Sequence, residues 1–337
     1  MSSSFRASPW LQGLERTRVA AMARMEQSGA ETPEEYAAWC GVELRDTHLD
    51  GAHGQLIDGP LGTYIVLADH LSDRGRRWTI AHELGHYDMR HPAPPTAELC
   101  TPRPTRLYGR CWHRNYEDEA NEWGMVTTMP DKTIARFCDR LPLTLDVAEQ
   151  LARTSGVPLV AAAIRLTEVT FRVCAAVLSL HGVIQWVSPS VRFLMLAAPG
   201  SLSPGRAVRP GSLARHFYDI GKLRDQPALV PAAAWFDGMG EDSWVQEHTV
   251  HLDEPGRVLT LLSTPSDVDA ERDPLMTPHA TAFLRDYLLS SDRALADFNK
   301  RFMPDEPCPY ARTWLEAFMR AGAESPAAQV DGFQRHP

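Results

Sequence analysis

The chain of 337 residues lacks paired cysteine motifs, long apolar runs and an excess of basic residues. Its six cysteines are scattered and form no C-x-x-C pair, which argues against a disulfide framework and favours reduced thiols in a cytoplasmic protein. No apolar run approaches the roughly 18 residues that a membrane helix needs, and the first residues show no apolar signal-peptide core, so we expect neither membrane insertion nor export. The formal net charge of −9 argues against a protein that binds nucleic acid through a broad basic surface.

The chain also has no internal repeat, and proline is dense only in residues 92–107. The composition is ordinary for a globular protein, with 44% apolar and 23% charged residues. Because a chain of 337 residues exceeds what one core usually serves, we expect two or three domains. The proline-dense segment predicts a long loop and is a candidate lid for the motif that precedes it.

That motif is the sequence WTIAHELGHY, which begins at Trp78 and contains the pattern H-E-x-x-H. On a helix, His82 and His86 lie four positions apart on one face, so their imidazoles can bind one metal ion. Glu83 lies beside them and can take a proton from a water at that ion. We expect Zn2+, because two neutral imidazoles, one carboxylate and an open fourth position suit this ion.

An alternative interpretation of the pattern is an exposed helix with two solvated histidines. The apolar residues Trp78, Ala81 and Leu84 argue against it, because they form a stripe that predicts burial beside the histidine pair. Gly85 costs about 1 kcal/mol relative to alanine inside a helix, which indicates close approach by another element.

A following helix, expected over residues 115–129, must supply the third ligand. The longer pattern H-E-x-x-H-x-x-G-x-x-H fails, because Met89 and Pro92 stand at its glycine and its third histidine. Glu117 and Asn121 are four apart and share a helix face. Glu117 can therefore bind the metal while Asn121 orients a ligand histidine.

Five further side chains near the motif have less certain roles. Glu119 and Glu122 point away from Glu117, and we expect them on a solvated acidic face. Tyr87, His113 and Tyr116 are near enough in sequence to donate a hydrogen bond to a developing oxyanion, and the sequence does not choose among them.

The two blocks W-T-I-A-H-E-L-G-H-Y and E-x-E-A-N-x-W, the second followed by M-P, resemble the ImmA/IrrE family of bacterial zinc metallo-endopeptidases over roughly residues 30–130. The family's usual forms are F-T-L-A-H-E-L-G-H and E-x-x-A-N-x-F-A-x-x-L-L-M-P. This chain departs at Gly124, where alanine is usual, and at Thr127 and Thr128, where the usual pair is apolar. These changes affect packing and substrate fit rather than catalytic groups.

The resemblance implies that His82, His86 and Glu117 are zinc ligands and that Glu83 is the catalytic base. It also implies a mostly helical, zincin-like metallopeptidase domain, which we place at residues 1–130. The implied substrate is a protein, a helix-turn-helix transcriptional repressor whose cleavage switches on a stress or mobile-element response.

Before the motif, the sequence predicts a helix over residues 9–28 and two strands, around 54–58 and 63–67. In many zinc peptidases an edge strand near the metal pairs with the extended substrate. These strands are candidates for that role, and an ordinary core strand is an equal alternative.

After the peptidase domain, residues 131–168 predict three short helices, and Gly156 between the last two gives the pattern of a helix-turn-helix. A DNA-reading helix needs basic and amide side chains, whereas this one offers only Arg165. We therefore expect a packed helical module, similar to the middle domain of the IrrE branch, and no direct DNA binding. A DNA-binding regulator using residues 144–168 is an alternative.

From residue 170 the pattern changes to strands, and those flanking Asp253-Glu-Pro-Gly256 predict a hairpin. His248 and His251 lie three apart on one of these strands, so they face opposite sides and make a poor metal pair. By resemblance to the IrrE branch we expect an α/β, GAF-like sensor domain with a candidate small-molecule ligand at residues 169–323. The expected strands are 173–179, 182–187, 244–252 and 257–262. The expected helices are 278–300 and 309–322, and we expect the tail 324–337 to be disordered.

The sequence thus predicts an α+β protein that hydrolyses peptide bonds with zinc. An alternative is a non-catalytic, zinc-containing regulatory protein that acts through ligand or partner binding of its C-terminal domain. The presence of Glu83 favours hydrolysis, because a purely structural metal site does not need that base.

Overall fold

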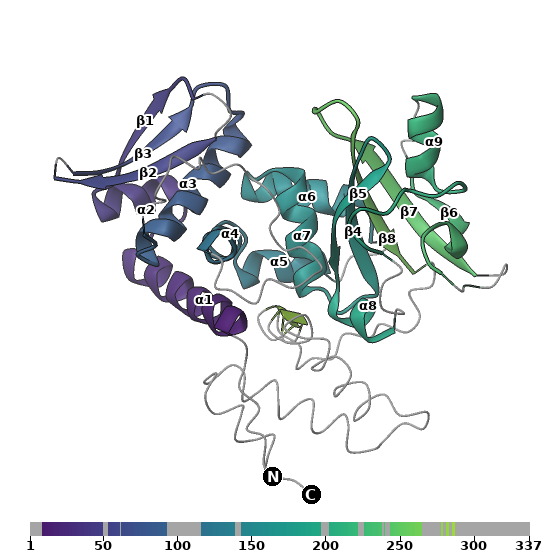
Figure 1. Ribbon diagram of the computed structural model, residues 1–337. Coiled ribbons are helices and arrows are strands. Elements are labelled where there is room, and N and C mark those ends of the chain that lie inside the picture. The colour runs from purple at the N-terminus through teal and green to yellow at the C-terminus, as the bar shows by residue number, and fades with distance from the viewer. Residues whose placement is uncertain are drawn as a thin grey trace, which may run out of the picture.

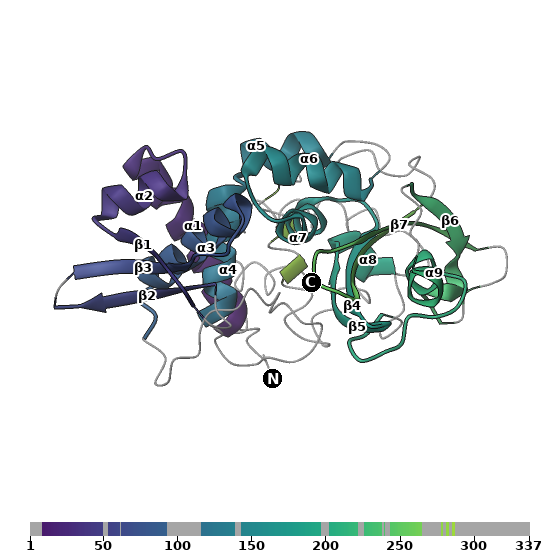
Figure 2. The ribbon, with the colours of Figure 1, turned by 90° about the horizontal axis from the view of Figure 1, so that it is seen from above.

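The computed structural model describes most of the chain up to residue 264 and a few positions beyond it. The described residues are 9–49, 53–60, 62–92, 116–138, 143–196, 202–221, 226–237, 239, 243–264, 278, 281–282 and 285–286. They form an α+β fold with two separate sheets. Figure 1 shows the smaller sheet at one end, the larger sheet at the other and helices between them, and the view from above in Figure 2 shows the same order.

The N-terminal part combines two helices with a three-stranded sheet. Its elements are α1 (Pro9–Ser28), α2 (Pro33–Cys40), β1 (Glu43–Thr47), β2 (Gly54–Gly59) and β3 (Gly62–Ala68). β3 is central and pairs in parallel with β1 and antiparallel with β2, so β2 lies at an edge. The helix and both strands predicted here are confirmed. β1 was not predicted, because its sequence ELRDT is polar and mostly exposed.

Two helices at the centre, α3 (Asp73–Asp88) and α4 (Tyr116–Thr128), pack directly on each other. The Ser72 side chain caps α3 by accepting a hydrogen bond from the Gly75 N–H, and so sets where the helix begins. A Cβ on Gly85 would lie 2.8 Å from Ala120 Cα and 2.9 Å from Trp123 Cβ. The predicted close approach at Gly85 is therefore confirmed, and only glycine fits there without a shift.

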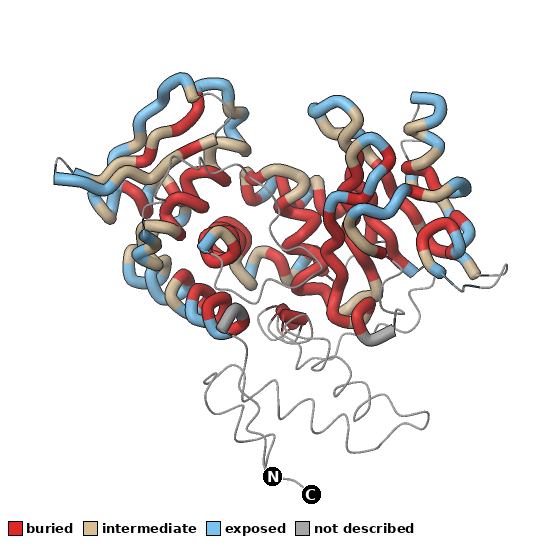
Figure 3. Tube along the Cα trace, viewed as in Figure 1, coloured by how far each residue is buried: buried red, intermediate tan, exposed pale blue. Residues whose placement is uncertain are grey.

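Three short helices follow, as predicted: α5 (Asp131–Cys138), α6 (Leu145–Ser155) and α7 (Leu159–Val169). α7 is buried from Ala161 to Val169, and even Arg165 is only 2% exposed. Figure 3 shows the same burial along α4 and α7, in contrast to the mostly exposed strand β1 of the small sheet. Arg165 is the one basic residue of α7, so its burial leaves no accessible basic side chain on this helix.

The larger sheet has five antiparallel strands in the order β5-β4-β8-β7-β6. The elements of this part are β4 (Cys174–Leu180), β5 (Val183–Pro189), α8 (Val191–Leu196), α9 (Leu213–Ile220), β6 (Ala228–Pro231), the 3-10 turn η1 (Ala232–Ala234), β7 (Trp244–His251) and β8 (Arg257–Ser263). The predicted hairpin is confirmed as β7 and β8. His248 is buried whereas His251 is exposed, as expected for opposite faces of one strand.

One apolar core runs from the α3–α4 pair into the larger sheet. It includes Trp78 of α3, Met125 of α4, Leu151 of α6 and Leu261 of β8. The boundaries predicted near residues 130 and 168 therefore fall within a shared core. A second cluster on the larger sheet includes Val177, Phe193, Leu213 and Trp235.

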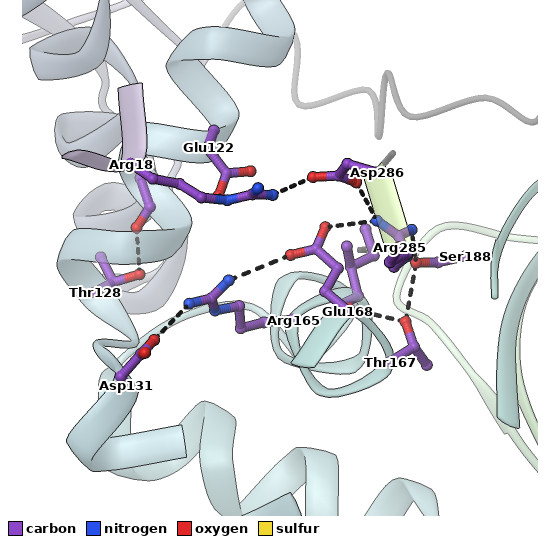
Figure 4. A network of polar contacts seen from close by, with 12 residues as sticks. Arg18, Glu122, Thr128, Asp131, Arg165, Thr167, Glu168, Ser188, Arg285 and Asp286 are labelled. Carbon is purple, nitrogen blue, oxygen red and sulfur yellow. Dashed lines mark hydrogen bonds and ion pairs between the residues drawn. The ribbon is translucent and has the colours of Figure 1, made fainter. Parts of the chain in front are cut away.

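A buried network of arginines and carboxylates joins segments that are far apart in the sequence (Figure 4). Arg18 of α1 donates to Glu122 of α4 over 2.6 Å and also pairs with Asp286. Arg285 lies 3.6 Å from Glu168 of α7 and 3.0 Å from Asp286. All five side chains are at most 1% exposed, so each charge relies on the others for compensation.

Some predictions fall largely on residues outside the described part. The segment 92–107, apart from Pro92, the helix 309–322 and the tail 324–337 lie outside it. Of the helix predicted at 278–300, the described positions 278, 281–282 and 285–286 are helical. In the part of the chain that the structure describes, no helix is long and apolar enough to cross a membrane.

Candidate metal centre

Three side chains from α3 and α4 converge on one point. His82 Nε2 lies 3.1 Å from His86 Nε2 and 3.2 Å from Glu117 Oε2. His86 Nε2 lies 3.3 Å from Glu117 Oε1. The predicted i, i+4 pair and the predicted carboxylate are thus brought together, and each residue offers one atom able to bind a metal, all within 4.8 Å of one another.

The electrostatics of this group favour an anionic Glu117. Burial alone would raise the pKa of its carboxyl, but hydrogen bonds and charge interactions with His82 and His86 hold that pKa far below its usual range. Burial opposes protonation of His82, yet contact with Glu117 and the charge of Glu83 raise the pKa of its imidazole. The site therefore attracts positive charge.

The donor set fits a zinc ion. Two unprotonated imidazole nitrogens 3.1 Å apart direct lone pairs at each other, which is unfavourable unless a proton or a cation lies between them. Around tetrahedral zinc, ligand atoms about 2.0–2.1 Å from the ion lie about 3.3 Å from one another. The two Nε2 atoms, 3.1 Å apart, lie close to that spacing, and each of them faces a different oxygen of Glu117, at 3.2 Å for His82 and 3.3 Å for His86.

Glu83, on the same helix as the histidines, is almost completely buried. Its Oε2 accepts a hydrogen bond of 2.8 Å from the Leu56 N–H of β2. Its Oε1 has no hydrogen-bond partner among the described residues. Gly54 allows β2 to pass this close, because a Cβ there would overlap Thr79 Cγ2. One oxygen of Glu83 is therefore fixed by the strand, and the other remains able to accept a proton.

Asn121 occupies the position predicted for it. Its Oδ1 lies 3.0 Å from His82 Nδ1. With His82 donating from Nδ1, the Nε2 lone pair is left facing His86 and Glu117. The contact thus has the geometry of an orienting hydrogen bond.

Two residues of the site were missed from the sequence. His91 Nδ1 lies 2.9 Å from His86 Nδ1, and His91 Nε2 lies 2.9 Å from Glu119 Oε2.

The expectation that Glu119 and Glu122 are solvated is wrong, because both are buried against α1. The sequence signal that could have indicated this burial was Gly13 in α1, because a Cβ at that position would overlap Glu119 Oε1.

The three candidate oxyanion donors, Tyr87, His113 and Tyr116, differ from one another in where they lie. The Tyr116 ring lies 4.6 Å from the His91 ring, and His91 in turn contacts His86. Tyr87 instead packs with the apolar cluster of α2 and β3. His113 lies outside the described residues.

Comparison with known protein families places the H-E-x-x-H motif within a matching family domain. Residues 40–167 match the Peptidase M78 family model, described as the IrrE N-terminal-like domain. This is a peptidase-type family whose members are metal-dependent in general. No sequence among curated proteins matches the chain.

A solved structure of a Mycobacterium tuberculosis transcriptional regulator is similar at 14% identity, covering 75% of this chain and 80% of that one. Its TM-score of 0.45 is too low to establish a shared fold. The match over residues 40–167 spans the histidine motif and Glu117 and extends into α7. Residues 40–167 of the chain therefore match an IrrE N-terminal-like domain, in agreement with the resemblance to the ImmA/IrrE family that the motifs indicate.

Proposed function

We propose that the chain is a zinc-dependent endopeptidase in which His82, His86 and Glu117 hold Zn2+ and Glu83 is the catalytic base. The observation that carries this proposal is the convergence of His82, His86 and Glu117 beside Glu83, with imidazole nitrogens and carboxylate oxygens 3.1 to 3.3 Å apart. A structural metal site has no need for such a carboxylate.

When bound, zinc supplies a Lewis acid for peptide hydrolysis. Glu83 takes the proton of the attacking water at Oε1 and later delivers it to the leaving amine. The Leu56 N–H holds Oε2 of Glu83, so the carboxylate keeps one orientation during both transfers. Tyr116, beside His91, is the described candidate for stabilising the oxyanion.

One edge of β2 pairs with no other described strand, and we propose that the substrate docks along it. In an antiparallel pair, backbone groups point alternately to the partner strand and away from it. The Leu56 N–H points away from β3 and is bonded to Glu83, so backbone groups of Gly54 and Asp58 and the carbonyl of Leu56 face the edge that has no described partner strand. An extended chain pairing there lies next to the proposed base.

We further propose the substrate class and the setting that the family implies. The substrate is a helix-turn-helix repressor in the cytoplasm, and its cleavage switches on a stress or mobile-element response. Support comes from the match to the IrrE N-terminal-like domain.

The C-terminal part is proposed to be a GAF-like sensor for a small molecule or a partner, with α5–α7 as a helix-turn-helix-like module between it and the peptidase part. The antiparallel five-stranded sheet is compatible with this role, and the apolar core shared by α4, α7 and β8 gives it a physical link to the site. Regulation without catalysis remains the second candidate function, and it predicts that Glu83→Gln keeps full biological activity.

Metal binding provides the test. The wild type should bind one zinc ion per chain, and His82→Ala and Glu117→Ala should lose that binding. Glu83→Gln should bind zinc and fail to cleave. A Glu83→Gln variant that cleaves as well as the wild type would exclude the proposed mechanism.

A further inference from the structure

We propose that His91 and Glu119 are positioning residues that fix the orientation and the tautomer of His86. This inference rests on the proposed zinc centre and adds two residues to it. Neither would touch the ion: His91 contacts His86, and Glu119 contacts His91.

The contacts form a continuous chain that ends on a carboxylate. His86 Nδ1 and His91 Nδ1 are 2.9 Å apart, and His91 Nε2 and Glu119 Oε2 are 2.9 Å apart. The side chains of His91 and Glu119 are 1% and 3% exposed, so water hardly competes for these bonds. Arg16 lies 3.3 Å from Glu119 Oε1 and favours its anionic form.

One assignment of protons to the histidine rings satisfies both hydrogen bonds that link His86, His91 and Glu119. A carboxylate only accepts, so His91 donates to Glu119 from Nε2 and keeps a lone pair on Nδ1. That lone pair accepts from His86, which must then carry its proton on Nδ1. The Nε2 of His86 is left with its lone pair facing His82 and Glu117, as a metal ligand requires.

The backbone after α3 is shaped to bring His91 back onto His86. Arg90 adopts a φ of 51°, a left-handed conformation that is uncommon for residues other than glycine. The His91 N–H donates to the His86 carbonyl over 3.0 Å, and the Arg90 N–H to the Tyr87 carbonyl over 3.2 Å. This pair of bonds is a Schellman turn. The left-handed conformation of Arg90 costs free energy, and the turn that requires it places the side chain of His91 against His86.

α4 thus orients both histidines. Asn121 Oδ1 lies 3.0 Å from His82 Nδ1, and Glu119 reaches His86 through His91. The same helix supplies Glu117. Both imidazoles are held by their Nδ1 atoms, with their Nε2 atoms turned towards one point.

Zinc affinity, measured by competition with a chromophoric chelator, tests the proposal on the full chain. His91→Phe keeps an aromatic ring and removes the acceptor, so zinc binding should weaken by about 10–100-fold. His91→Asn restores an acceptor near the former Nδ1 and should recover most of the affinity. His70→Phe is the matched control, because His70 is exposed and lies outside the group, and its affinity should equal that of the wild type.

Several outcomes would overturn the proposal. Zinc binding by His91→Phe that is as tight as in the wild type, while His82→Ala loses it, would exclude His91 and leave the metal centre intact. Equal affinities of the wild type and His82→Ala would overturn the metal centre and this inference with it. A lower unfolding temperature of metal-free His91→Phe, with no rescue of zinc affinity by His91→Asn, would indicate a packing role only.

Nuclear magnetic resonance of zinc-loaded protein with labelled histidine gives a second readout. The Nδ1–H proton of His86 should be protected from exchange with water in the wild type and lose that protection in His91→Phe. The corresponding proton of His82 should stay protected in both, because its partner is Asn121. A His86 proton that remains protected in His91→Phe would contradict the proposal.

Discussion

The Leu56 N–H donates a hydrogen bond of 2.8 Å to Oε2 of Glu83. This bond joins the edge strand β2 to the proposed catalytic base on α3. The strand proposed to bind the substrate therefore also holds the group proposed to move the proton. A shift of β2 would disturb both functions.

The first prediction concerns this bond. Leu56→Pro removes the N–H, and an edge position whose N–H points away from the ladder tolerates proline. Cleavage should slow by about 10–100-fold because Glu83 loses its orientation, while zinc affinity should stay unchanged. Leu56→Ala keeps the donor and is the control. Equal cleavage rates for the two variants would show that the bond does not position Glu83.

The second prediction compares two glycines on α3 and α4. Gly85→Ala places a Cβ 2.8 Å from Ala120 Cα, so the two helices must move apart. The free energy of unfolding should fall by about 1–3 kcal/mol, and zinc affinity should weaken as His86 moves away from Glu117. Chemical denaturation and zinc titration measure the two effects.

The matched control is Gly124→Ala, whose Cβ would meet Trp78 and His82 at ordinary distances of 3.5 and 3.6 Å. This change should stabilise α4 by up to about 1 kcal/mol through helix propensity. A Gly124→Ala variant as unstable as Gly85→Ala would argue against the helix contact as the cause.

The third prediction concerns the buried ionic network. Arg18→Met leaves Glu122 and Asp286 buried without their shared cation, and the free energy of unfolding should fall by about 3–5 kcal/mol. Arg45→Met removes an exposed partner of Glu43 and should leave stability close to that of the wild type. Similar losses for both variants, measured by chemical denaturation, would contradict the importance of burial.

The fourth prediction is a pH dependence of stability. The Leu145 N–H at the start of α6 donates to His248 Nδ1 over 3.1 Å, while the Thr144 side chain makes no cap bond. Burial lowers the pKa of His248 below its usual 6.5, against the charge of Asp146. The folded protein thus binds fewer protons there than the unfolded chain. This stability is present above pH 6.5 and is lost as the pH falls towards the lowered pKa.

His248→Asn provides the comparison, because its side-chain oxygen can accept from Leu145 and does not titrate. Below pH 6.5 the free energy of unfolding should fall more steeply in the wild type, by at most about 1.4 kcal/mol per pH unit. Parallel pH profiles for the two proteins would show that His248 does not contribute.

Relationships within one helix could be predicted from the sequence. The pairing of His82 with His86 and of Glu117 with Asn121 follows from the i, i+4 geometry, and the glycine at 85 indicated the close contact. The β7–β8 hairpin followed from its turn residues in the same way. In each case the signal lies within a few neighbouring residues.

Relationships that depend on distant segments or on unusual backbone could not be predicted. His91 reaches His86 only because Arg90 takes a left-handed conformation, which a sequence pattern does not indicate. Glu119 and Glu122 look like a solvated face on their own helix, but α1 covers them.

The central claim is that Glu83 makes this chain a peptidase. The most direct test compares new protein N-termini in host cells that express, at equal levels and with zinc supplied, the wild type or Glu83→Gln. The proposal predicts one new N-terminus within a helix-turn-helix protein in wild-type cells, absent with Glu83→Gln. Identical sets of N-termini before and after genotoxic or oxidative stress would contradict it and favour a non-catalytic regulator.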